Sequence, residues 1–202
     1  MLRTLSAFVL VGVMSLNVAQ ASGPAIINIQ EDWELVLGDP DPNVVGPQIT
    51  CVIAPVGHAE GIYATVNLNH QDRNGFVPGG IQLQLWNGST EIGSQCDLNL
   101  QTLDASGEAI HWTQEMTLIP SDRVRFSIRD GHCDTWGNFG PGLTCSVPTS
   151  LQSLNEYDPE VSLSNSGTVF AANRVASLKL LRVRIVYEGG QVNSLELNRS
   201  VE

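Results

Sequence analysis

The clearest pattern in the chain is a regular alternation of apolar and polar residues between positions 107 and 140. Apolar residues from Ile110 to Leu118 share one parity, and the polar residues between them share the other. After residues 120–122 the alternation starts again. Because successive side chains of a strand point to opposite faces of a sheet, this stretch predicts a long hairpin with one apolar face.

Weaker versions of the same pattern predict strands along the rest of the chain, at residues 25–30, 33–37, 48–56, 61–69, 80–86, 91–100, 177–186 and 191–201. Asn87-Gly88 and Glu188-Gly189-Gly190 are turn sequences that favour hairpins between neighbouring strands. A change of parity near Leu180 predicts a β-bulge. Residues 150–157 are the one stretch with helical character, and they predict a short helical turn.

These elements predict an all-β protein built as a two-sheet antiparallel β-sandwich. Roughly ten strands separated by short turns are expected, without the strand–helix–strand order that builds a parallel sheet. A jelly-roll architecture of the lectin and glucanase type is favoured over an immunoglobulin-like sandwich. The reason is length, because the 202-residue chain is well above the ~100 residues of an immunoglobulin-like domain.

The N-terminal residues predict a secretory signal peptide at positions 1–21. Arg3 is followed by an apolar run from Ala7 to Leu16, and the segment ends in the small residues of Ala19-Gln20-Ala21. The apolar run is shorter than the ~20 residues of a membrane span. We therefore expect an exported protein, secreted or extracytoplasmic, with residues 22–202 forming one domain and no membrane span.

The composition bears on two questions, whether the protein binds nucleic acid and whether it forms disulfide bonds. The chain has 10 Lys and Arg against 21 Asp and Glu, for a formal net charge of -11, so a nucleic acid partner is not expected. Four cysteines follow the predicted signal peptide, and in an oxidising compartment they predict two disulfides. Of the possible pairings we favour Cys133–Cys145, within one loop, and Cys51–Cys96, between strands.

One candidate ligand-binding surface lies on a predicted strand face. Gln82, Gln84 and Trp86 share one parity, opposite the apolar residues of the same strand. Amide groups can bond sugar hydroxyls, and an indole can stack on a sugar ring. The alternative interpretation is an ordinary solvated face, or a Trp86 that is covered by a loop.

A second candidate surface is the loop that follows the long hairpin. Its polar and aromatic residues are Asp130, Asp134, Trp136 and Asn138. Loops on rigid sandwiches often carry binding residues. The alternative is a structural loop held by a disulfide, with Trp136 packed against the sulfur atoms.

Carboxylate pairs are the candidates for catalysis. Glycosidases use two carboxyl groups roughly 5 to 10 Å apart. Glu115 lies on the polar face of the hairpin, and its possible partners are Asp130, Asp134 and Glu108. The compact runs of alternating acids found in some sandwich glucanases are absent from the sequence, so catalysis is the alternative rather than the leading hypothesis.

A metal site receives little support from the sequence. Asp39, Asp41 and Asn43 have the alternating oxygen ligands of a calcium loop, but Val44 and Thr50 stand where an EF-hand needs glycine and glutamate. We interpret this segment as a Pro-rich acidic turn and expect no cofactor, with bound calcium as the alternative. The four histidines do not have zinc-motif spacing.

The sequence therefore predicts a secreted, non-catalytic binding module that recognises a polysaccharide or surface glycan. Two alternatives stay open. One is a glycan-cleaving hydrolase or lyase that uses a carboxylate pair, and the other is a structural protein of a cell envelope or matrix.

Overall fold

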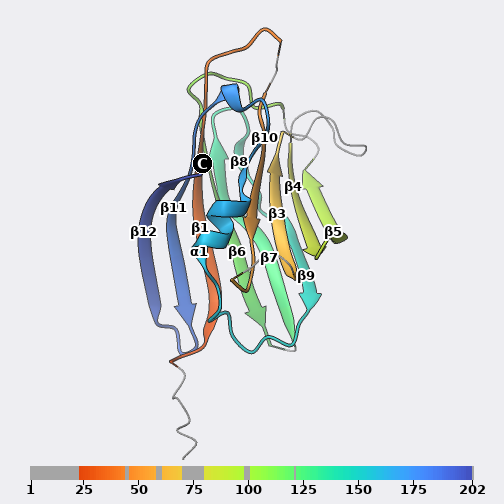
Figure 1. Ribbon diagram of the computed structural model, residues 1–202, viewed down its shortest axis with the longest axis vertical. Helices are drawn as coiled ribbons and strands as arrows, with labels where there is room; N and C mark the ends of the chain where they lie inside the picture. Colours follow the sequence, from red (N-terminus) through yellow and green to blue (C-terminus); the bar gives the residue numbers. More distant parts are fainter. Residues whose placement is uncertain are drawn as a thin grey trace, which may run out of the picture.

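A computed structural model describes residues 23–43, 46–57, 61–69, 80–97, 101–120 and 122–201. The predicted signal peptide at residues 1–21 lies outside this part of the chain. The described residues form two antiparallel sheets that pack face to face (Figure 1). The expected β-sandwich is thereby confirmed.

The larger sheet contains the long hairpin that the alternating pattern predicted. Its strands in the described part of the chain are β1 (Ile26–Leu37), β6 (Ala109–Ile119), β7 (Arg123–Cys133), β8 (Gly137–Phe139), β9 (Thr144–Pro148), β11 (Val175–Tyr187) and β12 (Val192–Ser200). They are ordered β12-β11-β1-β6-β7-β8, and β9 also pairs with β7. Two strands far apart in sequence, β1 and β11, are thus neighbours in this sheet.

The smaller sheet is mainly a run of consecutive strands. It contains β2 (Gln48–Ile53), β3 (Ile62–Leu68), β4 (Ile81–Asn87), β5 (Thr90–Asp97) and β10 (Gly167–Phe170). The strand order is β10-β2-β3-β4-β5, so each of β2, β3 and β4 pairs with the next strand in the chain. Asn87-Gly88 predicted the β4–β5 hairpin, and the hairpin is present, with Gly88 and Ser89 as the turn residues between the paired Asn87 and Thr90.

The core lies between the two sheets and is formed by the apolar residues that point inward from their strands. Trp33 of β1 and Trp112 of β6 are opposite one another and stack with ring centroids 6.3 Å apart. Inward residues of the smaller sheet, among them Val66 and Leu83, belong to the same buried cluster. Burying a large apolar side chain contributes roughly 1.5–3 kcal/mol, so this two-sided cluster is the main source of stability.

Two local predictions have opposite outcomes. The bulge expected near Leu180 is present, because the register of β11 shifts between Leu180 and Arg182. The helical turn expected at residues 150–157 was wrong, and α1 is formed instead by Pro159–Asn165. The side chain of Asp158 accepts a hydrogen bond from the Glu160 backbone N–H, and Pro159 has a backbone angle suited to a first helical position. In the described part of the chain no helix is long and apolar enough to cross a membrane.

All four cysteines are free thiols in the structure, contrary to the two expected disulfides. The pairing Cys51–Cys96 is wrong because register places the two on opposite faces of the smaller sheet. Cys51 aligns through Val66 and Leu83 with Gln95, one residue away from Cys96. The Cys133 sulfur accepts a hydrogen bond from the Trp136 backbone N–H instead of bonding to Cys145. Burial and the nearby Cys96 both raise the pKa of Cys145.

Glu31 interrupts the apolar parity of β1, and its side chain is fully buried in the core. Its carboxylate accepts hydrogen bonds from Ser162 (2.5 Å) and Tyr157 (2.7 Å), which come from α1 and the segment before it. Trp33 and Gln114 donate to the other oxygen, at 3.0 and 3.2 Å. Burial nevertheless dominates and raises the pKa of Glu31 to about 7 from 4.5.

The raised pKa predicts a pH dependence of stability. The folded state retains the Glu31 proton more tightly than the unfolded chain, so this contribution is complete below pH 4.5 and is lost as the pH rises through about 7. The loss is on the order of 3 kcal/mol. We expect the unfolding free energy of the wild type, relative to Glu31→Gln, to fall by that order between pH 4.5 and 7.5, as measured by chemical denaturation. Glu34→Gln, on the outer face of the same strand, is the matched control. A difference that stays constant with pH would contradict the assignment.

Candidate functional site

The predicted surface on β4 is occupied by contacts within the protein. Gln84 is buried, accepts a hydrogen bond from Asn67 at 2.8 Å and donates one to Glu91 at 2.8 Å. Gln82 is also buried. Trp86 is half-buried, stacks on Tyr63 with centroids 6.2 Å apart and donates to a hydroxyl of β3. Of the three predicted side chains, Trp86 is therefore the one that a ligand could still contact.

The predicted loop between β7 and β8 is held in place by Glu108. The carboxylate of Glu108 accepts hydrogen bonds from the backbone N–H and the hydroxyl of Thr135, at 2.6 and 2.7 Å. Trp136 packs edge-on against Phe139, with centroids 5.0 Å apart. Asp134 and Asn138 are exposed beside them. The loop is thus anchored by a carboxylate rather than by a disulfide, and Glu108 is not available as a partner for Glu115.

Asp130 is the predicted residue that the structure brings to a concave surface. It has a left-handed backbone conformation (φ 51°) at the irregular end of the β6–β7 pairing and lines two adjoining hollows on the outer face of the larger sheet. The first has a volume of about 570 Å³, and its polar lining is Glu115, Arg125, Ser127, Arg129, Asp130 and Thr144. The second, of about 260 Å³, has the polar side chains of Gln30, Asp32, His111, Thr113, Asp130, His132, Arg182 and Arg184 in its lining.

A glycine shapes one wall of the first hollow. Residues 141–144 line it, and the Leu143 backbone N–H donates to the Gly140 carbonyl at 3.0 Å. Gly140 has a φ of +90°, and a Cβ atom at this position would lie 2.6 Å from a methyl group of Ile128. Only glycine fits such a position without strain, so the wall depends on it.

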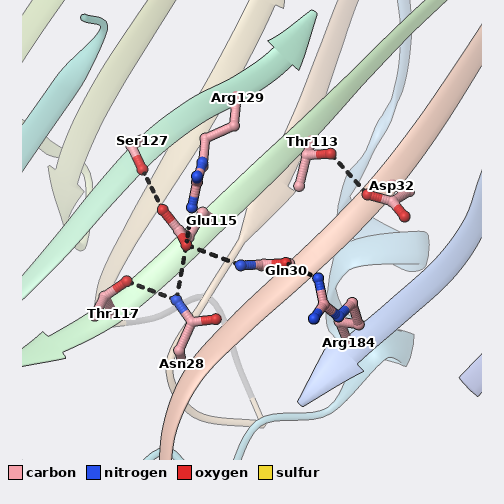
Figure 2. A network of polar contacts seen from close by, with 9 residues as sticks. All are labelled: Asn28, Gln30, Asp32, Thr113, Glu115, Thr117, Ser127, Arg129 and Arg184. Atoms are coloured by element: carbon pink, nitrogen blue, oxygen red, sulfur yellow. Dashed lines mark hydrogen bonds and ion pairs between the residues drawn. The ribbon is translucent and has the colours of Figure 1, made fainter. Parts of the chain in front are cut away.

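Glu115 is the centre of a polar network between the two hollows (Figure 2). One of its oxygens accepts hydrogen bonds from Asn28, Gln30 and Arg129 at 2.9–3.0 Å, and the other accepts from Ser127 at 3.0 Å. These partners come from β1 and β7, on either side of β6, because the outward parities of the three strands are in register. Burial raises the pKa of Glu115, but the three neutral donors and the Arg129 charge outweigh it, and the net shift is downward from 4.5.

The second hollow has its own ion pair and a pair of stacked imidazoles. Asp32 accepts from the Thr113 hydroxyl at 2.7 Å and forms an ion pair with Arg182 at 2.5 Å. His111 and His132 are parallel, with ring centroids 4.9 Å apart. The surface thus offers guanidinium, amide, hydroxyl, carboxylate and imidazole groups. Its two tryptophans, Trp33 and Trp112, are at most 2% exposed and cannot stack on a ligand.

Sequence reasoning identified Glu115 and Asp130 but missed the arginines that surround them. The signal was present in the alternation, because Arg123, Arg125, Ser127 and Arg129 all occupy the outward parity of β7. The register that aligns Arg184 with Gln30 of β1 joins segments more than 150 residues apart and was not visible in the sequence.

The described residues contain no group of three or more His, Cys, Asp or Glu side chains placed to hold a metal ion. In the candidate calcium segment, Asp41 accepts hydrogen bonds from the Asn43 backbone and the Asn173 side chain, both at 2.8 Å. These oxygens therefore hold a turn together. Comparisons of the chain with protein-family models, curated proteins and solved structures gave no match.

Glu115 is expected to stabilise the fold through its charge. Replacing it by glutamine at pH 7 should reduce the unfolding free energy by about 1.5–3 kcal/mol, the usual range for hydrogen bonds to a charged group. Because the folded-state pKa is lowered, this contribution is present above pH 4.5 and is lost as the pH falls through the lowered value. Denaturation of the wild type and Glu115→Gln at pH 7 and pH 3 measures it. A deficit that is equally large at both values would contradict the proposed ionic contribution.

Proposed function

We propose that this protein is an exported, non-catalytic binding module for a polysaccharide or surface glycan, with its binding site in the two hollows on the outer face of the larger sheet. The observation that supports the proposal is the polar network around Glu115, which fixes donors and acceptors from four neighbouring strands on one concave surface. Export remains an expectation from the N-terminal sequence.

The hollows suit a sugar in both size and chemistry. The larger one, at about 570 Å³, lies within the usual range of ligand pockets. Sugars present many hydroxyl groups that both donate and accept hydrogen bonds. Ser127 and Thr144 provide hydroxyls, and Arg125 and Arg129 provide donors. Because the side chains start from paired strands, their positions change little on binding, which limits the entropy cost.

The same network argues for binding rather than catalysis. Both oxygens of Glu115 already accept hydrogen bonds, and its lowered pKa keeps it ionised at neutral pH. A general acid in a glycosidase needs a raised pKa so that it carries a proton at the working pH. Glu115 therefore has the electrostatics of an acceptor that orients its neighbours.

A binding screen tests the proposal. We expect the purified protein to bind a related set of glycans on an array, and Arg125→Ala combined with Ser127→Ala to weaken binding about tenfold or more, since each lost polar contact contributes roughly 0.5–1.5 kcal/mol. Arg199→Gln, which removes the same charge from β12, is the matched control. Loss of binding in Trp86→Ala or Trp136→Ala, with the Arg125 and Ser127 variant unaffected, would move the site to those tryptophans. A folded protein that binds no glycan would contradict the proposal and favour a structural envelope or matrix protein.

A glycan-cleaving enzyme is the second candidate function, and one observation favours it. Glu115 and Asp130 line the same hollow. Of the three carboxylates that the sequence suggested as partners for Glu115, Asp130 is the one on this surface. In such an enzyme Glu115 would act as the ionised base or nucleophile, and Asp130 as the acid. Release of reducing ends from a glycan that the protein binds, abolished by both Asp130→Asn and Glu115→Gln, would establish this function. Cleavage that survives Asp130→Asn would exclude the pair.

A further inference from the structure

We infer that the glycan bound at the outer face of the larger sheet is polyanionic, with carboxylate or sulfate groups on more than one sugar unit. This inference rests on the proposed function and specifies the class of ligand. It is drawn from the charges that line the hollows, from which of them are already paired, and from how far apart the remaining ones lie.

The charge of the two hollows differs from that of the chain. Over the whole sequence, acidic residues outnumber Lys and Arg by 21 to 10. In the hollows the order is reversed, since four arginines face three carboxylates: Arg125, Arg129, Arg182 and Arg184 against Asp32, Glu115 and Asp130. A concave surface of an acidic protein on which arginines outnumber carboxylates favours the binding of anions there.

Two of the three carboxylates are neutralised within the protein. Glu115 is paired with Arg129 at 3.0 Å, and Asp32 is paired with Arg182 at 2.5 Å. The hydrogen bond and charge of Asp32, and then the charge of Glu196 on β12, raise the pKa of Arg182 further. These two arginines therefore hold the network together and are not the main attraction for a ligand.

Arg125 and Arg184 are the arginines whose charge is left over. Arg125 is exposed and lines the first hollow. Among the described residues it forms no hydrogen bond or ion pair. Within the same described residues, Arg184 donates one hydrogen bond, to the neutral amide oxygen of Gln30 at 3.4 Å, and forms no ion pair. Both guanidinium groups keep donors for a carboxylate or sulfate, with which arginine forms bidentate hydrogen bonds. Asp130, the remaining acid, lies where the two hollows meet.

The spacing of these two arginines favours a polymer. Arg125 is on β7 and Arg184 is on β11, with β6 and β1 between them. Three strand spacings of about 4.8 Å separate their backbones by roughly 14 Å across the sheet. A single sugar unit is shorter than this backbone separation, whereas consecutive units of a chain can contact both side chains. The amide and hydroxyl groups around Glu115 lie along this path and can bond the hydroxyls between the charges (Figure 2).

Binding to defined polysaccharides tests the inference. The probes are polygalacturonate for carboxylates, dextran sulfate for sulfates, the neutral chains dextran, xylan and soluble cellulose derivatives, and single-stranded DNA. We expect one or both anionic polysaccharides to bind, and the affinity to fall about tenfold or more between 50 and 300 mM NaCl, because salt screens exposed charges. The double variant Arg125→Gln and Arg184→Gln should lose at least as much, whereas Arg199→Gln should bind as the wild type does.

The outcomes separate this inference from the proposed function. Salt-independent binding of a neutral polysaccharide, unaffected by the double variant, would overturn the inference and leave the glycan-binding function intact. A folded protein that binds none of the polysaccharides would overturn both. DNA binding of equal strength that depends on the same two arginines would show an anion site without glycan specificity, and would also overturn the inference. Thermal unfolding of each variant shows that it is folded.

Discussion

The two-residue period of β1, β6 and β7 is the constraint on which both the core and the polar outer surface of this protein depend. The parity that points inward puts Trp33 against Trp112 and closes the core. The parity that points outward puts Glu115 beside Gln30 and Ser127 and builds the polar surface. Because the two sets alternate along the same strands, a shift of register by one residue would exchange core and surface, and would destroy both.

Two glutamates on the central strands show how completely environment decides the behaviour of one side chain. Glu31 points inward, where four donors do not compensate for full burial, and its pKa rises to about 7. Glu115 points outward, where amide and hydroxyl donors and the charge of Arg129 lower its pKa below 4.5. The difference is that Glu31 has no cationic partner among its contacts and Glu115 has one. Glu31 therefore joins α1 to β1 in a protonation-dependent way, while Glu115 carries a negative charge at neutral pH that orders the surface.

The proposed site combines elements that have different structural origins. Paired strands fix the arginines, amides and hydroxyls, while the wall at residues 141–144 depends on the backbone of Gly140. Asp130, at an irregular point in β7, joins the two hollows. This arrangement places loop residues next to a rigid polar platform, which is a general way for a sandwich to acquire binding specificity without any change of fold.

The sequence by itself determined the β-sandwich, the β6–β7 and β4–β5 hairpins, the bulge near Leu180 and the burial of Trp112, because each follows from local periodicity or turn chemistry. It also identified Glu115 on the polar face of the hairpin and Asp130 in the loop expected to follow it. Tertiary structure decided the rest. Pairing of β1 with both β6 and β11 brought Gln30, Glu115 and Arg184 together. In the smaller sheet, Gln84 is buried among neighbouring side chains on a face that alternation alone would leave open to solvent. The Cys51–Cys96 pairing failed for the same reason, and Cys133–Cys145 failed because register places Cys145 opposite Phe126, seven residues from Cys133 along β7. The spacing of two cysteines along the chain does not tell whether their side chains meet in the folded sheet. That depends on the register between the strands that carry them.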